Sequence, residues 1–349
     1  MLSSFDIGNV RVSPNLVLAP MSGVTNSCFR KLIRGENPGA LGLAVTEFIS
    51  IEGLTRRNGR SLQMMEYGEE DRPISIQIFG YDIDRMVEAA KMVEDTGANI
   101  VDINCGCPVP KVVKRGGGCE LMRQTFHLNK ILTRVVKAVS IPVTLKIRSG
   151  WDDESRNALD VGRMAEDAGV AMLAVHGRTR KALYRGIADW EIVAQVADEL
   201  KIPVVGSGDI IDVDSAKQAL LSGVAGIMIG RGAMANPWIF AEIAAAVRGE
   251  PFERPGVLET IELLERYSLI LSERMPERGV TGKMKQLASQ ATRRLKGSSK
   301  ARRAICTSQS LAEMLEVLEQ WREYVLSDGS EGAAIISTAQ ELPLGELAP

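Results

Sequence analysis

The stretch Ile100-Val-Asp-Ile-Asn-Cys105 is a short apolar run, and Gly106-Cys107-Pro108 follows it directly. An apolar run of this length that ends in glycine and proline predicts a buried β-strand. Because α/β enzymes carry reactive side chains at the carboxyl ends of parallel strands, Asn104 and Cys107 are the first candidates for a functional site. A buried cysteine is more often inert packing, so this interpretation depends on the neighbouring strands.

Seven further strand-like runs occur along the chain, and amphipathic segments separate most of them. The eight predicted strands cover residues 15–21, 43–48, 74–79, 100–104, 142–147, 172–176, 203–205 and 226–229. The predicted helices between them include residues 83–96, 120–139, 159–168, 190–200 and 213–222. Eight βα repeats predict an α/β fold with a closed (β/α)8 TIM barrel. The alternative is an open doubly wound sheet, but no Gly-x-Gly-x-x-Gly follows the first strand.

The composition is that of an ordinary soluble globular protein, with 349 residues, 45% hydrophobic and 25% charged. The five cysteines show no spacing typical of a secreted disulfide framework, and the amino terminus does not resemble a signal peptide, so we expect a cytoplasmic location. The sequence has no apolar run long enough to predict a membrane segment. The net charge of −2 favours neither DNA nor a membrane surface, and no pattern predicts a protein partner. A polyanionic partner would need a local basic patch.

Such a patch lies in the last third of the chain, where strand signals end. The composition changes after Pro237 and predicts a barrel over residues 1–250, a helical domain over 255–326 and a flexible tail over 327–349. Between Arg278 and Ala312 there are nine basic residues and no acidic one. A solvated helix face is the alternative, but such faces normally mix charge signs. The block therefore favours a surface for phosphate groups, with three central candidates: Arg293, Arg294 and Lys296.

Polar residues also occur where the barrel strands should be apolar. The first predicted strand ends in Ala19-Pro20-Met21, whose amides and apolar surface suit a flat ring, although a simple turn is equally compatible. Gln77, Lys146 and His176 lie in three later strands. A buried amide or ammonium group without a partner loses its hydration, so these residues indicate a polar ligand. For Lys146 the alternative is a structural ion pair with Asp102.

The last two strands carry a phosphate-binding pattern. Gly206-Ser207-Gly208-Asp209 follows the seventh strand and Gly230-Arg231-Gly232 follows the eighth. TIM barrels often bind a phosphate group there, because glycine lets the backbone approach closely and arginine supplies a forked cation. Two tight turns with incidental glycines are the alternative. Sugar-phosphate isomerases and aldolases would show the same pattern, so the class of enzyme depends on the other residues.

Taken together, the chain resembles the flavin-dependent tRNA dihydrouridine synthases, most of all their bacterial B-type branch. The resemblance extends over the whole barrel and continues through Arg293-Arg-Leu-Lys-Gly297 into the last helices. The matching stretches, in the family's order, are Leu18-Ala-Pro-Met-Ser-Gly-Val-Thr25, Gln77-Ile-Phe-Gly80, Ile103-Asn-Cys-Gly-Cys-Pro108, Leu145-Lys-Ile-Arg-Ser-Gly-Trp-Asp152, Val175-His-Gly-Arg-Thr-Arg180, Gly206-Ser-Gly-Asp-Ile210 and Ile229-Gly-Arg-Gly232.

The resemblance implies a role for each matching residue. Cys107 falls at the family's proton donor, whereas Asn104 and Arg178 fall at positions that meet the uracil. Ser207 and Cys105 depart from the family, which usually has asparagine at the first position and often a small residue at the second. The positions that hold FMN in the family correspond here to Ala19, Pro20, Met21, Gln77, Lys146, His176, Ser207, Gly208, Asp209, Gly230 and Arg231.

The implied reaction reduces the C5–C6 bond of specific uridines in tRNA to 5,6-dihydrouridine, with NADPH or NADH as the reductant. A hydride would pass from FMN to C6, and Cys107 would give a proton to C5. A cysteine thiol is mostly protonated at pH 7, so it suits this task. A metal site at Cys105, Cys107 and Cys119 does not fit the spacing of known clusters. An FMN-dependent barrel enzyme for a free pyrimidine and a non-catalytic RNA-binding relative stay open as alternatives.

Overall fold

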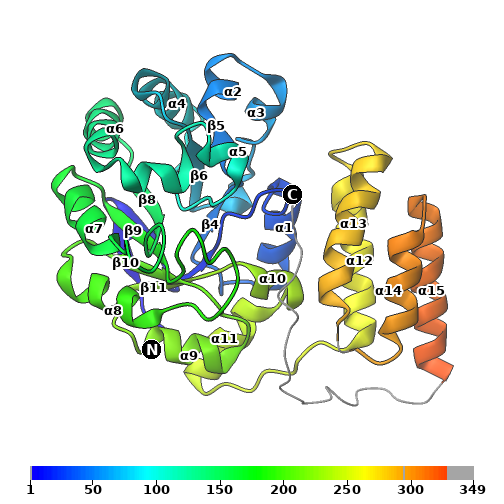
Figure 1. Ribbon diagram of the computed structural model, residues 1–349. Coiled ribbons are helices and arrows are strands. Elements are labelled where there is room, and N and C mark those ends of the chain that lie inside the picture. The colour runs from blue at the N-terminus through cyan, green and yellow to red at the C-terminus, as the bar shows by residue number, and fades with distance from the viewer. Residues whose placement is uncertain (1, 294, 328–349) are drawn as a thin grey trace.

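The computed structural model describes residues 2–293 and 295–327, and eight parallel strands form its centre. They follow chain order around a closed ring, because β11 pairs with β3 and β4 pairs with β6. This confirms the predicted (β/α)8 barrel, which Figure 1 shows beside a group of helices. The ring consists of β3 (Leu16–Leu18), β4 (Leu43–Val45), β6 (Ile74–Phe79), β7 (Ile100–Cys105), β8 (Val143–Arg148), β9 (Met172–His176), β10 (Val204–Ser207) and β11 (Gly226–Ile229).

Side chains along each strand alternate between the inside of the barrel and the helices outside, as the pleat of a strand requires. In β7, Ile103 and Cys105 belong to the large cluster under the helices. The residues that alternate with them, Asp102 and Asn104, are buried on the other face. In β8 the same alternation separates Leu145 from Lys146. The polar residues of the sequence therefore share the interior of the barrel.

Two short strands that the sequence analysis did not predict close the amino end of the barrel. β1 (Phe5–Ile7) and β2 (Val10–Val12) form an antiparallel hairpin. The hairpin packs against the first residues of the barrel strands, and a side chain added at Gly226 would come within 2.8 Å of the Phe5 ring. A further strand, β5 (Ile49–Ser50), extends the sheet beside β6. Only the carboxyl end of the barrel is left for a site.

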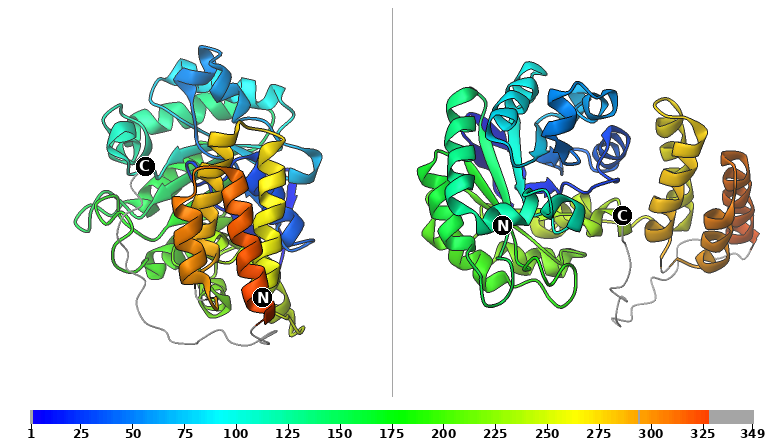
Figure 2. Two further views of the ribbon diagram at one scale, coloured as in Figure 1. Left: turned by 90° about the vertical axis from the view of Figure 1, so that its right-hand side faces the viewer. Right: turned by 45° about the horizontal axis from the view of Figure 1, so that its top comes forward.

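Helices surround the barrel, as both views in Figure 2 show. Five of the helices α1–α11 begin where a side chain caps the first turn, as Asp212 does by accepting from the Ser215 amide. The predicted helix over 120–139 is shorter, because a 3-10 turn, η2 (Gly118–Arg123), precedes α6. The longer helices are α1 (Ser27–Glu36), α4 (Ile83–Asp95), α6 (Thr125–Ala138), α7 (Ala158–Asp167), α8 (Trp190–Glu199), α9 (Val213–Leu220) and α11 (Ile239–Arg248). The short ones are α2 (Ile51–Thr55), α3 (Gly59–Gln63), η1 (Glu69–Asp71), α5 (Pro110–Val113) and α10 (Arg231–Ala235).

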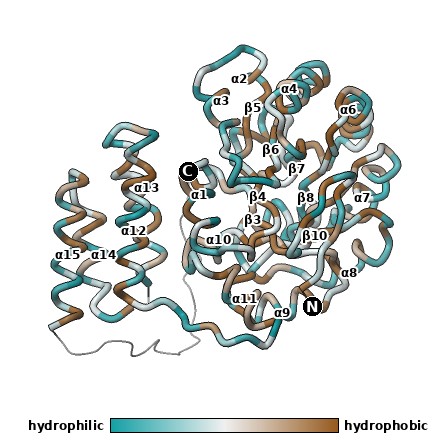
Figure 3. The backbone as a smooth tube through the Cα atoms, turned by 180° about the vertical axis from the view of Figure 1, so that it is seen from behind, coloured by the Kyte–Doolittle hydropathy of each residue, from teal (hydrophilic) through white to brown (hydrophobic). Residues whose placement is uncertain are grey.

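Four helices follow the barrel and pack into a bundle beside it: α12 (Val257–Ser272), α13 (Glu277–Ala291), α14 (Ser298–Thr307) and α15 (Leu311–Ser327). Their apolar residues face one another, and α12 and α13 lie nearest the barrel (Figure 3). This is the helical region that the composition predicts. The predicted tail lies outside the described residues except for Ser327. None of the helices in the described ranges has the length and hydropathy of a membrane span.

The bundle is attached to the barrel through α1. Phe29 of α1 meets Tyr267 of α12 edge to face, with the ring centroids 6.4 Å apart. Glu36 accepts from Arg266 at 2.9 Å. Lys283 of α13 donates from Nζ to the Gly23 carbonyl, just after the turn that ends β3. These contacts tie the bundle to a segment that reaches the mouth of the barrel.

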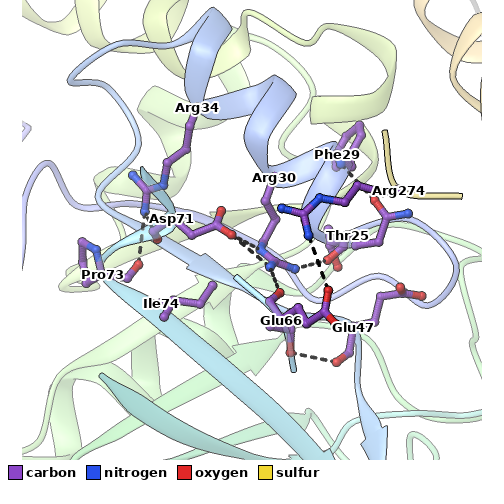
Figure 4. A network of polar contacts seen from close by, with 12 residues as sticks. Thr25, Phe29, Arg30, Arg34, Glu47, Glu66, Asp71, Pro73, Ile74 and Arg274 are labelled. Atoms are coloured by element: carbon purple, nitrogen blue, oxygen red, sulfur yellow. Dashed lines mark hydrogen bonds and ion pairs between the residues drawn. The ribbon is translucent and has the colours of Figure 1, made fainter. Parts of the chain in front are cut away.

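A buried ion pair fixes α1 itself (Figure 4). Arg30 and Asp71 are 3.0 Å apart, and their side chains are 1% and 2% exposed. Arg30 also donates to the carbonyls of Thr25 and Glu66, at 2.9 Å each. Such a pair tolerates burial because the remaining donors of the guanidinium group find acceptors. Arg274, just beyond α12, lies 3.6 Å from Glu66 and continues the network to the bundle.

Candidate active site at the barrel mouth

The polar residues that the sequence analysis selected meet at the carboxyl ends of the strands. Asn104 lies opposite Lys146 in the register of β7 and β8, and Arg148 lies opposite His176 in that of β8 and β9. Ser207 completes the row beside His176. Sequence positions more than 100 residues apart therefore line one mouth. This is the end of the barrel that the hairpin leaves open.

Cys107 follows β7 and is held by its own backbone. Its amide donates to Asn104 Oδ1 at 2.9 Å, and its carbonyl accepts from the Cys119 amide at 3.1 Å. The side chain is 6% exposed. Burial raises the pKa of the Cys107 thiol, although the Val109 backbone and Arg148 oppose the shift. The group is therefore a neutral thiol at pH 7, with a proton to give.

Asn104 is already engaged with the protein. Its Nδ2 donates to Gln77 Oε1 at 2.7 Å, while its Oδ1 accepts from Cys107 and, at 3.3 Å, from Gly106. Gln77 in turn donates to Asp102 at 2.6 Å. Both amides therefore support the Cys107 turn, and each nitrogen keeps one hydrogen for a ligand.

Lys146 does not form the structural ion pair with Asp102 that was the alternative. No carboxylate lies within ion-pair distance of it among the described residues, and its ammonium group makes no hydrogen bond there. Burial lowers the pKa of Lys146 to about 8, and the nearby Arg148 adds to the shift. Asp102 is instead held by Thr144 and Gln77. The cation is thus buried at the mouth with no ion-pair or hydrogen-bond partner in the part of the chain that the structure describes.

His176 lies among positive charges. Burial lowers its pKa well below the ordinary value, and four cations add to the shift, namely Arg148, Lys146, Arg178 and Arg231. Its Nε2 is buried and has no hydrogen-bond partner. A neutral imidazole with a buried, unpaired nitrogen can form a hydrogen bond with a bound ligand. The same four cations make the mouth attractive to an anion.

Arg178, predicted to meet a uracil, is mostly occupied elsewhere. Its Nη2 forms an ion pair with Asp209 at 2.6 Å, and its Nε donates to the Arg185 carbonyl at 3.1 Å. Asp209 also pairs with Arg231 at 3.1 Å and adopts a left-handed backbone, with φ of 54°. Only Nη1 of Arg178 is buried without a partner. Asp209 therefore acts first as the anchor of two arginines.

The turn after β3 differs from expectation in one respect. The Ala19 amide donates to the Ile229 carbonyl at 2.9 Å, and the Met21 amide donates to Thr25 Oγ1 at 3.0 Å. These amides are therefore spent within the protein, and Pro20 has none. What the turn can offer a ring is its apolar surface. Gly230 lies beside it, where an added Cβ would sit 3.5 Å from Ala19 Cβ and Met21 Sδ.

Gly208 shows a tighter constraint on its backbone. Its φ is +128°, which side chains rarely adopt, and an added Cβ would lie 2.5 Å from Ala188 Cβ and 3.1 Å from His176 Cδ2. Its carbonyl accepts from Trp190 Nε1 at 3.1 Å. Glycine is required here, next to the unused imidazole nitrogen.

Arg148 lies at the candidate site, although the sequence patterns did not single it out. It is 2% exposed, and its guanidinium group donates to three backbone carbonyls: Gly106 at 3.0 Å, Thr179 at 3.0 Å and Leu183 at 2.7 Å. It therefore joins the Cys107 turn to the loop after β9. The signal was present, because a charged residue in an apolar strand needs a partner, but the partners are backbone atoms that no sequence pattern identifies.

The basic residues of the bundle divide into two groups. Arg293 and Lys296 are exposed, whereas Arg294 lies outside the described residues. Lys283, by contrast, is partly buried against the barrel, where burial lowers its pKa and the Glu47 carboxylate opposes the shift. Arg302 donates within the bundle to the Thr292 carbonyl at 3.4 Å. Part of the basic block therefore serves the structure, whereas its exposed members among the described residues are Arg278, Arg293, Lys296, Lys300 and Arg303.

Comparison with known proteins points to one family. Residues 17–326 match the profile of the dihydrouridine synthase (Dus) family. A probable tRNA-dihydrouridine synthase of Rickettsia bellii is 42% identical over 269 residues, which cover 76% of this chain and 82% of the relative. A tRNA-dihydrouridine synthase B of Xanthomonas campestris is 45% identical over 239 residues, which cover 68% and 71% of the two chains.

A solved structure gives the fold alone. A 2-naphthoyl-CoA reductase in complex with 2-naphthoyl-CoA superimposes with a TM-score of 0.52 at 15% identity. The match covers 72% of this chain and 53% of the reductase. At this identity the likeness supports the barrel architecture and says nothing of the substrate.

Proposed function

This chain is a member of the dihydrouridine synthase family, and on that premise we propose that it reduces uridines in tRNA to 5,6-dihydrouridine. One observation supports the proposal above the others: a neutral thiol, Cys107, lies at a mouth lined by Lys146, Arg148, Arg178 and Arg231. Such a mouth suits an anionic redox cofactor and a proton donor at the same place.

Flavin dependence is a property of the family, and we propose FMN as the form bound here. The unused His176 Nε2, the unpaired Lys146 ammonium group and the free Nη1 of Arg178 are polar atoms that a ligand of this kind would satisfy. Gly208 and Gly230 leave room for close approach. The remaining contacts would come from Ala19, Pro20, Met21, Gln77, Ser207, Asp209 and Arg231.

The bound flavin would supply the hydride for C6 of the uracil. The chain's own contribution is the proton for C5, and Cys107 can give it because burial keeps its thiol protonated. Lys146, positively charged at pH 7 with its pKa near 8, would stabilise negative charge on the reduced ring. The second amide hydrogen of Asn104 and Arg178 Nη1 would contact the base.

The RNA must present its target base outside the stack, since a stacked uracil cannot enter a barrel mouth. We propose that the helical bundle holds the phosphate backbone through Arg293, Arg294 and Lys296, and that the division into a barrel (1–250) and a helical domain (255–326) is functional as well as structural. NADPH or NADH would serve as the reductant. A location in the cytoplasm follows from a tRNA substrate.

The direct test uses purified protein with FMN, NADPH and tRNA from cells that lack the modification. We expect dihydrouridine in the tRNA by mass spectrometry, and no product with Cys107→Ala, which should still bind FMN and oxidise NADPH. Full turnover by Cys107→Ala would contradict the role of the thiol. Reduction of free uracil in preference to tRNA would instead identify an enzyme for free pyrimidines.

A further inference from the structure

A chain of short hydrogen bonds runs through the barrel interior beneath the mouth. Thr144 Oγ1 donates to Asp102 Oδ1 at 2.5 Å, and Gln77 Nε2 donates to Asp102 Oδ2 at 2.6 Å. Asn104 Nδ2 then donates to Gln77 Oε1 at 2.7 Å. The chain ends where the Cys107 amide donates to Asn104 Oδ1 at 2.9 Å. All four side chains before Cys107 are at most 5% exposed.

The two ends of the chain determine its direction. The backbone amide of Cys107 can only donate, and the Asp102 oxygen that faces Gln77 accepts. Between these ends, Gln77 must turn its nitrogen to Asp102, and Asn104 must turn its nitrogen to Gln77 and its oxygen to Cys107. If either amide were reversed, two donors or two acceptors would face each other. A buried clash of that kind costs about as much as an unmade hydrogen bond.

We propose that Asp102 is a positioning residue for the reaction, because its acceptor oxygen fixes the orientation of Gln77 and Asn104 and so holds the Cys107 turn under the mouth. The proposal rests on the proposed function in one respect, the role of Cys107 as proton donor. Asp102 itself lies deeper than Cys107 and touches neither the thiol nor the mouth in any recorded hydrogen bond.

The usual explanation for a buried aspartate, an ion pair, does not apply. Lys146 is the nearest candidate cation, and it forms no ion pair with Asp102. Burial raises the pKa of Asp102, and the hydrogen bonds from Thr144 and Gln77, together with the charge of Lys146, oppose the shift. A buried carboxyl group that no cation contacts directly is costly, and the charge of Lys146 offsets only part of that cost. Its place at the end of an oriented chain gives the group a function.

A double-mutant cycle at residues 102 and 144 tests the proposal. In Asp102→Asn the new amide can still turn its oxygen to Gln77, because its nitrogen can donate to the Thr144 hydroxyl oxygen. In Thr144→Val, Asp102 Oδ1 loses its donor, but Oδ2 still accepts from Gln77, so the orientation of both amides is kept. In Asp102→Asn/Thr144→Val the nitrogen loses its partner, so every arrangement leaves a buried polar group unpaired. Each single variant thus controls for the other.

The first readout is the alkylation rate of each cysteine in the FMN-bound protein, measured by iodoacetamide labelling and peptide mass spectrometry. We expect each single variant within about threefold of wild type and the double variant about tenfold faster at Cys107. Exposed Cys306 and buried Cys28 are internal references, and both should keep their rates. A rise at Cys28 as well would mean general loosening of the fold and would overturn the specific role.

The second readout is uridine reduction, in which kcat should fall about tenfold in the double variant while KM for tRNA stays constant. Equal alkylation and equal kcat in all four proteins would overturn the proposal. If wild type does not reduce tRNA, the proposed function fails, and the alkylation arm still decides whether Asp102 positions the Cys107 turn. If the double variant does not fold, the Thr144→Val variant tests the proposal. A Cys107 alkylation rate more than about threefold above wild type in that variant would mean that Asp102 alone does not fix the orientation of the amides, and would overturn the proposal.

Discussion

Lys146 is expected to make the flavin-free protein less stable, and its removal should show by how much. Burial in the barrel interior lowers its pKa from 10.5 to about 8. A shift of about 2.5 pH units corresponds to about 3 kcal/mol, at 1.36 kcal/mol per unit. At pH 7 the lysine is protonated in both the folded and the unfolded chain, so the folded chain carries the whole cost of the buried charge.

The sign of the pH dependence follows from proton counts. Between pH 8 and pH 10.5 the unfolded chain binds more protons at this position than the folded one, so the free energy of unfolding rises with pH. Above pH 10.5 the lysine is neutral in both states, so the cost of burying its charge no longer lowers the free energy of unfolding. Lys146→Met keeps an unbranched side chain that is one atom shorter and removes the charge, so the variant lacks this rise.

The assay is urea unfolding of flavin-free wild type and Lys146→Met at intervals from pH 7 to pH 10.5. At pH 7 we expect the variant to be more stable by about 2–3 kcal/mol, with the difference shrinking towards zero at the upper limit. The same variant should bind FMN more weakly and accept electrons from NADPH more slowly. A difference that does not change with pH, or a less stable variant at pH 7, would refute the argument.

Three further outcomes are expected. Asp71→Ala should cost about 3–5 kcal/mol of stability in urea unfolding, because it leaves Arg30 buried without its counterion, whereas Arg11→Ala at an exposed ion pair should cost under about 1 kcal/mol. Lys283→Met should speed FMN release, measured by fluorescence, because the Gly23 turn loses its contact with the bundle. The salt dependence of tRNA binding should not change in this variant. A smaller salt slope would mean that Lys283 contacts phosphate. Joint neutralisation of Arg293, Arg294 and Lys296 should reduce the slope of log tRNA affinity against log salt concentration by about two to three. NADPH oxidation should not change.

Much of the barrel could be predicted from sequence because its strands are sharply bounded. The strands at 74–79, 172–176 and 226–229 agree with the structure to the residue. Each is an apolar run that ends in glycine or polar residues, so local sequence is enough. The hairpin of β1 and β2 escaped prediction, since three-residue strands carry too little pattern and depend on the barrel end that they cover.

At the candidate site, residue types were easier to predict than their partners. Gln77, Lys146 and His176 stood out because a polar residue in an apolar strand is costly. The contacts of Asn104 and Arg178 could not be predicted, because the amide of Cys107 and the carboxylate of Asp209 reach them only in the folded barrel. Lys283 shows the same limit, because a charge pattern cannot tell a buried contact from an exposed one.

The β1–β2 hairpin also affects the route by which ligands reach the barrel. Phe5, Ile7 and Val12 fill the amino end, so ligands are expected to reach the barrel from the carboxyl end. On the proposed function, we expect the nicotinamide reductant and tRNA to use this same end and to bind there in turn. The kinetic pattern should therefore be ping-pong, with parallel double-reciprocal lines, and excess tRNA should inhibit competitively against the nicotinamide substrate.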